Sequence, residues 1–366
     1  MLKIIAAKYK RLTAQRKNDI EMSIEEFKEK RILPPKEQIS KLEELANIDQ
    51  SIIKNMTGFL YTEVLSLFED LKPMLKTSGR GKKPTLMKID SLLYTLAFLA
   101  HGETYESMSR DYNINMTVLA SNITDMIQHL SKMSRLWIFQ IKREDQVLSN
   151  LQFTGLSEVA FVHGTFFCLC DKKRDVVKMP LYGVYGVQIQ TLHHPNGTVA
   201  FFSEIYKATT PKLEMFGDMI TFLDTILKKV ERPEEGPEAS HRHWAVLCDI
   251  KGADKLIRCV VKPDIARVED ERFKNIKEAC KIPHMFYGRM LKLFGILSSE
   301  LRRYSASILE TLIACMALTN QHILLHKLED SDGDYYNAWI QSLIEKGNEN
   351  KLKRKAQSEK YRKKKN

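Results

Sequence analysis

The chain has 366 residues, of which 43% are hydrophobic, and its formal net charge is +11. This length and apolar content are enough for two or three domains with sizeable cores. No apolar run approaches the ~20 residues of a membrane span, and charged residues follow the N-terminal apolar stretch too soon for a secretory signal. We therefore expect neither an integral membrane protein nor a secreted one, and the six irregularly spaced Cys are typical of reduced thiols inside a cell.

The first 84 residues are predicted to form surface helices and a basic linker. Residues 1–50 are charged and helix-prone, with Ser23 and Glu26 at capping-box spacing, and they form a charged helical arm in this interpretation. Residues 52–76 place apolar side chains at helical spacing and predict one helix that Pro73 ends. The Gly-rich linker that follows contains three candidate phosphate contacts, Arg80, Lys82 and Lys83.

Residues 85–135 predict a three-helix unit. One helix stops at His101-Gly102, Thr104 can cap a short second helix, and a third runs from Met116 to about Leu130. This order is the helix-turn-helix arrangement. The third helix has no Lys or Arg before Lys132. Two interpretations therefore stay open: the helix contacts phosphates without reading bases, or it packs within the protein without any DNA contact. Its early candidates for DNA binding are Thr117, Ser121 and Asn122.

Residues 151–330 predict a mixed sheet flanked by helices. Strand signals and helical periodicity alternate, and Asn196-Gly197 is a strong hairpin signal between the second and third strands. The expected fold is α+β, with an antiparallel set of strands followed by strands that alternate with helices. The predicted strands are Ser157–Cys170, Gly183–His193, Thr198–Tyr206, His243–Asp249 and Leu256–Val261, and the predicted helices are Leu213–Val230, 266–280 and 284–330.

Three segments of this region, taken together in their order along the chain, form a pattern. The first reads Val-Ala-Phe-Val-His163-Gly-Thr, the second reads Trp-Ala-Val-Leu-Cys-Asp249, and the third reads Pro-His284-Met-Phe-Tyr-Gly-Arg-Met-Leu-Lys. Their order and spacing resemble the nuclease core of Harbinger-type (PIF-type) DNA transposases. The resemblance covers about residues 55–325. It implies a helix-turn-helix-like domain at 51–150 and a ribonuclease-H-like domain of the DDE superfamily at 151–330.

The resemblance also implies a metal-binding carboxylate in each of the three segments, yet only Asp249 is acidic here. The other two places hold His163 and His284, and a further acidic place of the family holds Lys212. Cleavage of a phosphodiester by this family requires Mg²⁺, a hard cation that takes oxygen ligands. We therefore expect no resident cofactor and no metal site, and interpret the chain as a pseudoenzyme, with Mg²⁺ bound only if an active nuclease is rebuilt elsewhere.

Several alternatives stay open at this stage. A metal-dependent nuclease could use a displaced acidic set, drawn from Asp171, Asp175, Glu269 or Glu278, and a transition metal could bind His163, Asp249 and His284. Zinc at Cys168-x-Cys170 or His241-x-His243 lacks the other ligands of a structural site. Each of the three residues of the main pattern could also be an ordinary structural residue.

Residues 331–366 are predicted to form a basic C-terminal tail. In its last part, residues 351–366, nine of sixteen residues are Lys or Arg, which is typical of a disordered segment used for nuclear import or nucleic-acid contact, with a solubilising tail as the alternative. The candidate DNA contacts are Lys353, Arg354, Lys355, Arg362, Lys363 and Lys364. The sequence thus predicts an inactive, transposase-derived nuclear protein that binds DNA, with a protein-interaction scaffold as a further alternative.

Overall fold

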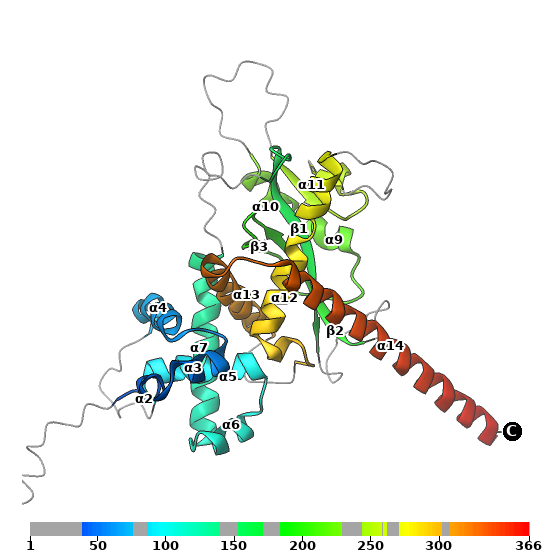
Figure 1. Cartoon of the computed structure of the whole chain (residues 1–366). Helices are drawn as coiled ribbons and strands as arrows, with labels where there is room; N and C mark the ends of the chain where they lie inside the picture. Colours follow the sequence, from blue (N-terminus) through cyan, green and yellow to red (C-terminus); the bar gives the residue numbers. More distant parts are fainter. Residues whose placement is uncertain are drawn as a thin grey trace, which may run out of the picture.

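A helical unit lies beside a mixed β-sheet in this protein (Figure 1). Helices cover both faces of the sheet, and one long helix leaves the body of the molecule toward the C-terminus. The computed structural model describes residues 39–75, 86–138, 153–170, 184–228, 244–257, 259–261, 271–301 and 308–365. The predicted capping box at Ser23 and the basic linker with Arg80, Lys82 and Lys83 lie outside these residues.

The first described helices are α2 (Lys41–Ile48), α3 (Gln50–Thr57) and α4 (Tyr61–Leu71). The prediction of one helix over residues 52–76 is wrong, because Gly58 ends α3 with a left-handed φ of 79°. This conformation strongly favours glycine, and a Cβ on Gly58 would also lie 3.1 Å from Leu293. The break is therefore set by packing against a segment more than two hundred residues away.

The predicted three-helix unit is present as α5 (Lys88–His101), α6 (Tyr105–Asp111) and α7 (Met116–Trp137). Thr104 caps α6, and Asn115 caps α7 by accepting from two backbone N–H groups. Helix α7 runs about two turns beyond the predicted end at Leu130. Its last turns stay helical because Met133 and Trp137 are buried in the core.

The sheet contains β1 (Val159–Leu169), β2 (Gly186–His193), β3 (Val199–Phe202), β5 (Ala245–Cys248) and β6 (Cys259–Val261), in the order β3-β2-β1-β5-β6. Strands β1, β2 and β3 pair antiparallel, whereas β5 runs parallel to β1 and β6 runs parallel to β5. The fold class is therefore mixed α and β, as predicted.

The hairpin predicted at Asn196-Gly197 is confirmed, with Gly197 at a φ of 92°. The third predicted strand, however, is two short strands, β3 and β4 (Tyr206–Lys207), both paired to β2. Ser203 separates them: its backbone N–H donates to the carbonyl of Gln190, and its Oγ accepts from the N–H of Gln190.

Helices pack on both faces of β1. On one face lie α9 (Lys212–Asp218) and α10 (Ile220–Ile226), which replace the single helix predicted over Leu213–Val230 because the helix is interrupted at Met219. On the other face lies α12 (Ile282–Leu293). Gly164 makes this second contact close, since a Cβ there would lie 2.4 Å from the Tyr287 hydroxyl.

Helix α13 (Ile308–Leu325) belongs to the core and packs along α7. Within the described ranges it has the length and hydropathy of a membrane span, with 56% of its residues buried inside the structure; the expectation that no run approaches this length is therefore corrected. Buried Asn320 ties it to two other elements. Its side-chain amide donates to the carbonyls of Trp137 and Val199 and accepts from the N–H of Val199.

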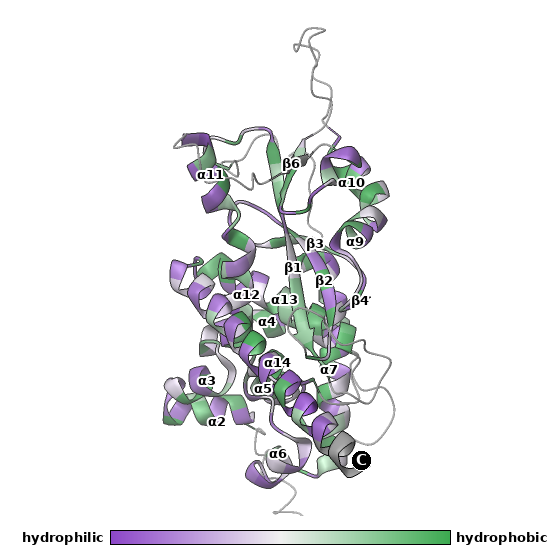
Figure 2. Cartoon of the chain, turned by 90° about the vertical axis from the view of Figure 1, so that its right-hand side faces the viewer, coloured by the Kyte–Doolittle hydropathy of each residue, from purple (hydrophilic) through white to green (hydrophobic). Residues whose placement is uncertain are grey.

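The C-terminal segment is helical, so the prediction of a disordered tail is wrong. Helix α14 runs without a break from Asp330 to Lys365. Its first half packs on α12 and buries Tyr336, Trp339 and Leu343. Its second half leaves the body of the molecule and is mostly hydrophilic (Figures 1 and 2).

The contact between α12 and α14 depends on a buried carboxylate. Asp332 is 1% exposed and accepts from the Arg289 guanidinium at 2.8 Å and from Lys292 Nζ at 2.9 Å. Burial would raise the pKa of Asp332, but the hydrogen bonds from Arg289, Lys292 and the N–H of Glu329 outweigh it and lower this pKa. The carboxylate is therefore ionised and paired at neutral pH.

Replacing Asp332 with Asn should lower the free energy of unfolding at pH 7 by about 3–5 kcal/mol, because it leaves two cations without their buried partner. Since the folded-state pKa is lowered, this contribution is present above the unfolded pKa of about 3.9 and is lost as the pH falls through the folded value. Urea unfolding at pH 7 and at pH 3 measures both effects. The exposed Asp334→Asn is the control, and equal losses in the two variants would contradict the clamp.

Candidate functional site

Two of the three residues singled out by the sequence pattern come together in the structure. His163 is in the middle of β1 and Asp249 directly follows β5. The parallel pairing of Val162 with Leu247 places His163 beside the C-terminal end of β5. The distance from His163 Nδ1 to Asp249 Oδ1 is 3.7 Å, within ion-pair range but longer than a hydrogen bond. The His163 side chain is fully buried, whereas that of Asp249 is half exposed.

Lys212 completes this cluster from the start of α9. Its Nζ lies 3.1 Å from Asp249 Oδ2, and its backbone carbonyl accepts from the Gln190 side-chain amide at 2.9 Å. The second contact attaches the first turn of α9 to β2 and so positions the ammonium. The His163 imidazole and then the Lys212 ammonium hold the pKa of Asp249 well below its usual range. The carboxylate is thus ionised and its charge is already neutralised by the protein.

His284 does not join the described cluster. It is exposed at the start of α12, with its ring 5.2 Å from the ring of Tyr336 on α14. Helix α12 packs on the face of β1 that contains Gly164, and His163, one residue earlier, points to the opposite face. Among the described residues no three His, Cys, Asp or Glu side chains are grouped to hold a metal, so these residues do not form the hypothetical His163–Asp249–His284 site.

The other metal-ligand candidates do not converge on Asp249 either, where the structure describes them. Glu278 pairs with Lys281 at 2.7 Å on the surface of α11 (Glu271–Ala279). Cys168 and Cys170 are buried thiols of β1 and its end. The remaining candidates lie outside the described residues: Asp171, Asp175, Glu269, His241 and His243.

Polar atoms without partners surround His163. Of the residues that the structure describes, only three have buried side-chain nitrogen or oxygen atoms with no hydrogen-bond partner, and these are His163 (both ring nitrogens), Thr165 and Gln190. Thr165 and Gln190 are paired residues of β1 and β2, and His163 shares the face of Thr165. The alternation of polar side chains at 163 and 165 and at 188 and 190 was the sequence signal for this polar cluster, and our sequence interpretation missed it.

The residues predicted to contact DNA differ in their environments in the structure. Thr117 and Ser121 are exposed on α7 and remain candidates, but Asn122 is used inside the protein: its side chain accepts from Ser91 Oγ and donates to the carbonyl of Val118. The Asn122 amide thus makes hydrogen bonds within the protein through both its oxygen and its nitrogen. On α14, Lys353, Arg354 and Lys355 are exposed. Arg362, Lys363 and Lys364 lie in the last turns of α14, and their side chains are outside the described ones.

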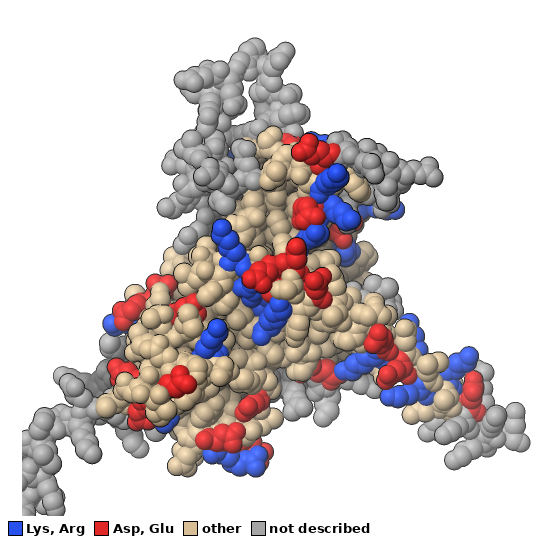
Figure 3. Space-filling model, viewed as in Figure 1, with Lys and Arg blue, Asp and Glu red and all other residues tan. Residues whose placement is uncertain are grey.

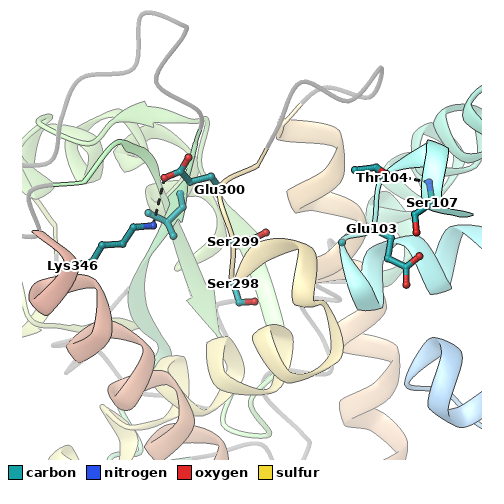
Figure 4. Close-up of a pocket in the computed structure, with 9 residues that line it drawn as sticks. Glu103, Thr104, Ser107, Ser298, Ser299, Glu300 and Lys346 are labelled. Carbon is teal, nitrogen blue, oxygen red and sulfur yellow. Dashed lines mark hydrogen bonds and ion pairs between the residues drawn. The ribbon is translucent and has the colours of Figure 1, made fainter. Parts of the chain in front are cut away.

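The structure also contains a cavity of about 680 Å³ where α6, the segment after α12 and α14 meet (Figure 4). Hydroxyl groups and two carboxylates line it, and one of these, Glu300, is paired with Lys346 at 3.5 Å. No His or Cys is among its lining residues, and it is distinct from the cluster of His163, Lys212 and Asp249. One of its two carboxylates is thus already paired with a cation, and no residue of the sequence pattern lines this cavity.

Comparisons with family models, with curated proteins and with solved structures find no match for this chain. Its function is therefore inferred from the residues of the cluster, the fold and the distribution of charge.

Replacing Lys212 with Met should raise the pKa of Asp249, because the ammonium that favours the carboxylate is removed. Titration of the Asp249 carboxyl carbon by NMR measures this shift. Stability at pH 7 should fall by less than about 1 kcal/mol, since both groups of the pair are half exposed. Lys255→Met, at an exposed position of the 3-10 helix Ala253–Lys255, is the control. An unchanged Asp249 titration in Lys212→Met would contradict the pairing.

The unpartnered hydroxyl of Thr165 allows a comparison with a partnered one. Thr165→Val should leave the stability unchanged or raise it, because no hydrogen bond is lost. Thr191→Val should cost about 1–3 kcal/mol, because the Thr191 hydroxyl is bonded to His193 Nε2 at 2.7 Å and to the Tyr287 hydroxyl at 2.6 Å. Thermal or urea unfolding compares the two variants, and a loss above about 1 kcal/mol in Thr165→Val would show that its hydroxyl has a partner.

Proposed function

We propose that this chain is a Harbinger-transposase-derived protein that binds DNA in the nucleus and does not cleave it. One observation is central to this proposal: in the place where the resemblance requires a metal-binding acidic cluster, Asp249 is ion-paired with Lys212 at 3.1 Å beside the buried imidazole of His163. The remaining evidence concerns the fold, the chemistry of the cluster and the charge.

The strand arrangement supports the ribonuclease-H-like part of the proposal. Three antiparallel strands, β1 to β3, are followed by two strands parallel to β1, and the order is β3-β2-β1-β5-β6. Helices α9 and α10 precede β5, and α12 packs on the opposite face of the sheet. The preceding unit of α5, α6 and α7 has the order of a helix-turn-helix domain.

The chemistry of the cluster argues against cleavage. Two-metal hydrolysis needs several carboxylates that hold Mg²⁺ ions at about 3.5–4 Å from each other, and the cluster has one carboxylate with its charge already compensated. A divalent cation would have to displace the Lys212 ammonium and accept an imidazole in place of an oxygen ligand, which Mg²⁺ disfavours. His163, Asp249 and Lys212 therefore suit a structural role better than a catalytic one.

The charge supports a nucleic-acid partner. The formal net charge is +11, and exposed Lys and Arg side chains gather on the outer half of α14 (Figure 3). Exposed Thr117 and Ser121 at the start of α7 can contact phosphates. The two alternatives are an active endonuclease with a displaced acidic set and a scaffold that binds proteins only. Assays of DNA binding and DNA cleavage distinguish both alternatives from the proposal.

The purified protein should bind duplex DNA with an affinity that falls steeply with salt, and it should not nick supercoiled plasmid in Mg²⁺ or Mn²⁺. Fluorescence anisotropy and gel analysis measure the two properties. Nicking that disappears in Asp249→Ala would establish the active alternative. The absence of any binding to duplex DNA at low salt would favour the scaffold.

Restoring acidic ligands tests the role of Lys212. The double variant His163→Asp/Lys212→Ala should bind Mn²⁺, detected by electron paramagnetic resonance, because two carboxylates then lie at the site without a competing ammonium. His163→Asp with Lys212 retained is the matched control and should bind less Mn²⁺. Equal Mn²⁺ binding by the two variants would mean that Lys212 does not exclude the cation.

A further inference from the structure

The outer half of α14 is exposed to solvent over the residues whose side chains the structure describes. The residues from Lys351 to Glu359 are all exposed, and the helical backbone continues to Lys365. At 1.5 Å per residue, the segment 351–365 is about 22 Å long. We call this segment the basic arm, and it projects from the molecule in Figure 1 (lower right).

The inner half of α14 fixes the direction of the basic arm. Asp332 is clamped by Arg289 and Lys292, and Trp339 stacks on Phe166 with ring planes 9° apart. Helix α14 has no break between these contacts and the arm. The arm therefore extends an anchored helix, unlike a flexible tail that is attached at one point.

The basic groups surround the arm instead of lying on one side. At about 100° per residue, the positions of Lys351, Lys353, Arg354 and Lys355 fall at about 0°, 200°, 300° and 40°. Leu352 is the exposed large apolar residue of this stretch, at 68%. Five further Lys and Arg follow in the sequence between 360 and 365, and their positions on the same helix fall at about 180°, 20°, 120°, 220° and 320°. The arm thus has no apolar face and no purely acidic face.

The distribution of basic groups around the arm favours one kind of polyanionic partner over others. A helix that lies on a membrane needs a broad apolar face, which the arm lacks. A flat acidic surface would compensate the charge on one side only. The major groove of B-form DNA is wide enough for an α-helix and has phosphates along both of its walls. The basic helices of leucine-zipper proteins bind in this groove. The major groove of A-form RNA is too narrow for this.

We propose that the basic arm lies as a helix in the major groove of duplex DNA, with its direction set by the clamp at Asp332. This inference rests on the DNA binding of the proposed function and deepens it by naming the element and the groove. Because basic groups lie all around the arm, most of them face the phosphates of the two groove walls instead of the base edges, so we expect mainly phosphate contacts and an affinity that differs little among sequences.

The test separates helical structure from charge. Ala356 is exposed in the middle of the arm, and Ala356→Pro breaks the helix there without changing the charge. Its affinity for a duplex of mixed sequence should fall by about tenfold or more, because the contacts beyond the break are misdirected. Ala356→Ser is the matched control and should bind like the unchanged protein. Circular dichroism and thermal unfolding check that the body is intact in each variant.

The same experiment includes deletion of residues 351–366, which should weaken binding and flatten the dependence of affinity on salt by about 0.9 for each lost phosphate contact. Unchanged affinity in Ala356→Pro, with weakened binding in the deletion, would overturn the helix-in-groove inference in favour of a flexible polycation. Unchanged binding in the deletion would overturn it while leaving the proposed function in place. Tighter binding to vesicles containing phosphatidylserine, or to duplex RNA, would also overturn it, whereas failure of the unchanged protein to bind DNA would overturn the proposed function itself.

Discussion

The contact between α12 and α14 is the constraint on which the rest of the structure depends. A Cβ on Gly288 would lie 1.7 Å from the carbonyl oxygen of Asp332, so the two helices touch backbone to backbone. The carboxylate of the same Asp332 is buried and compensated by Arg289 and Lys292. A buried ion pair of this kind is costly unless its geometry is complete, and here hydrogen bonds from three groups complete it. The direction of α14 follows from this one junction.

Helix α12 transmits the same constraint to the sheet, since Tyr287 and Pro283 occupy the space that a side chain at Gly164 would fill. One face of β1 is thereby closed by α12, and the other is covered by α9, whose first residue is Lys212. The residues that remain near Asp249 form a self-compensated group: a half-exposed carboxylate, an ammonium and a buried imidazole. Such a group has no unbalanced negative charge with which to attract a divalent cation, and this is the physical basis for our proposal that the chain does not cleave DNA.

The charge of the protein is used in two different ways. Between α12 and α14, Arg289 and Lys292 pair with the buried carboxylate of Asp332, so their charges are compensated within the protein. On the basic arm, the described cations Lys351, Lys353, Arg354 and Lys355 are exposed, and basic residues outnumber acidic ones in the sequence of the arm. Much of the net charge of +11 therefore lies at one end of a helix that is anchored to the body at Asp332.

The sequence by itself determined the elements whose signals are local: β1, β2, the hairpin that joins β2 to β3, and the helices α5 to α7. Residue periodicity and turn residues act over a few positions. The resemblance singled out His163 and Asp249, and their contact follows from the parallel pairing of β1 with β5. Only the tertiary structure decided the break at Gly58, the use of Asn122 inside the protein and the helical state of the basic C-terminal segment. The first two involve contacts between residues far apart in the chain, at Leu293 and Ser91. The third continues a helix that is anchored to α12 where Gly288 meets Asp332.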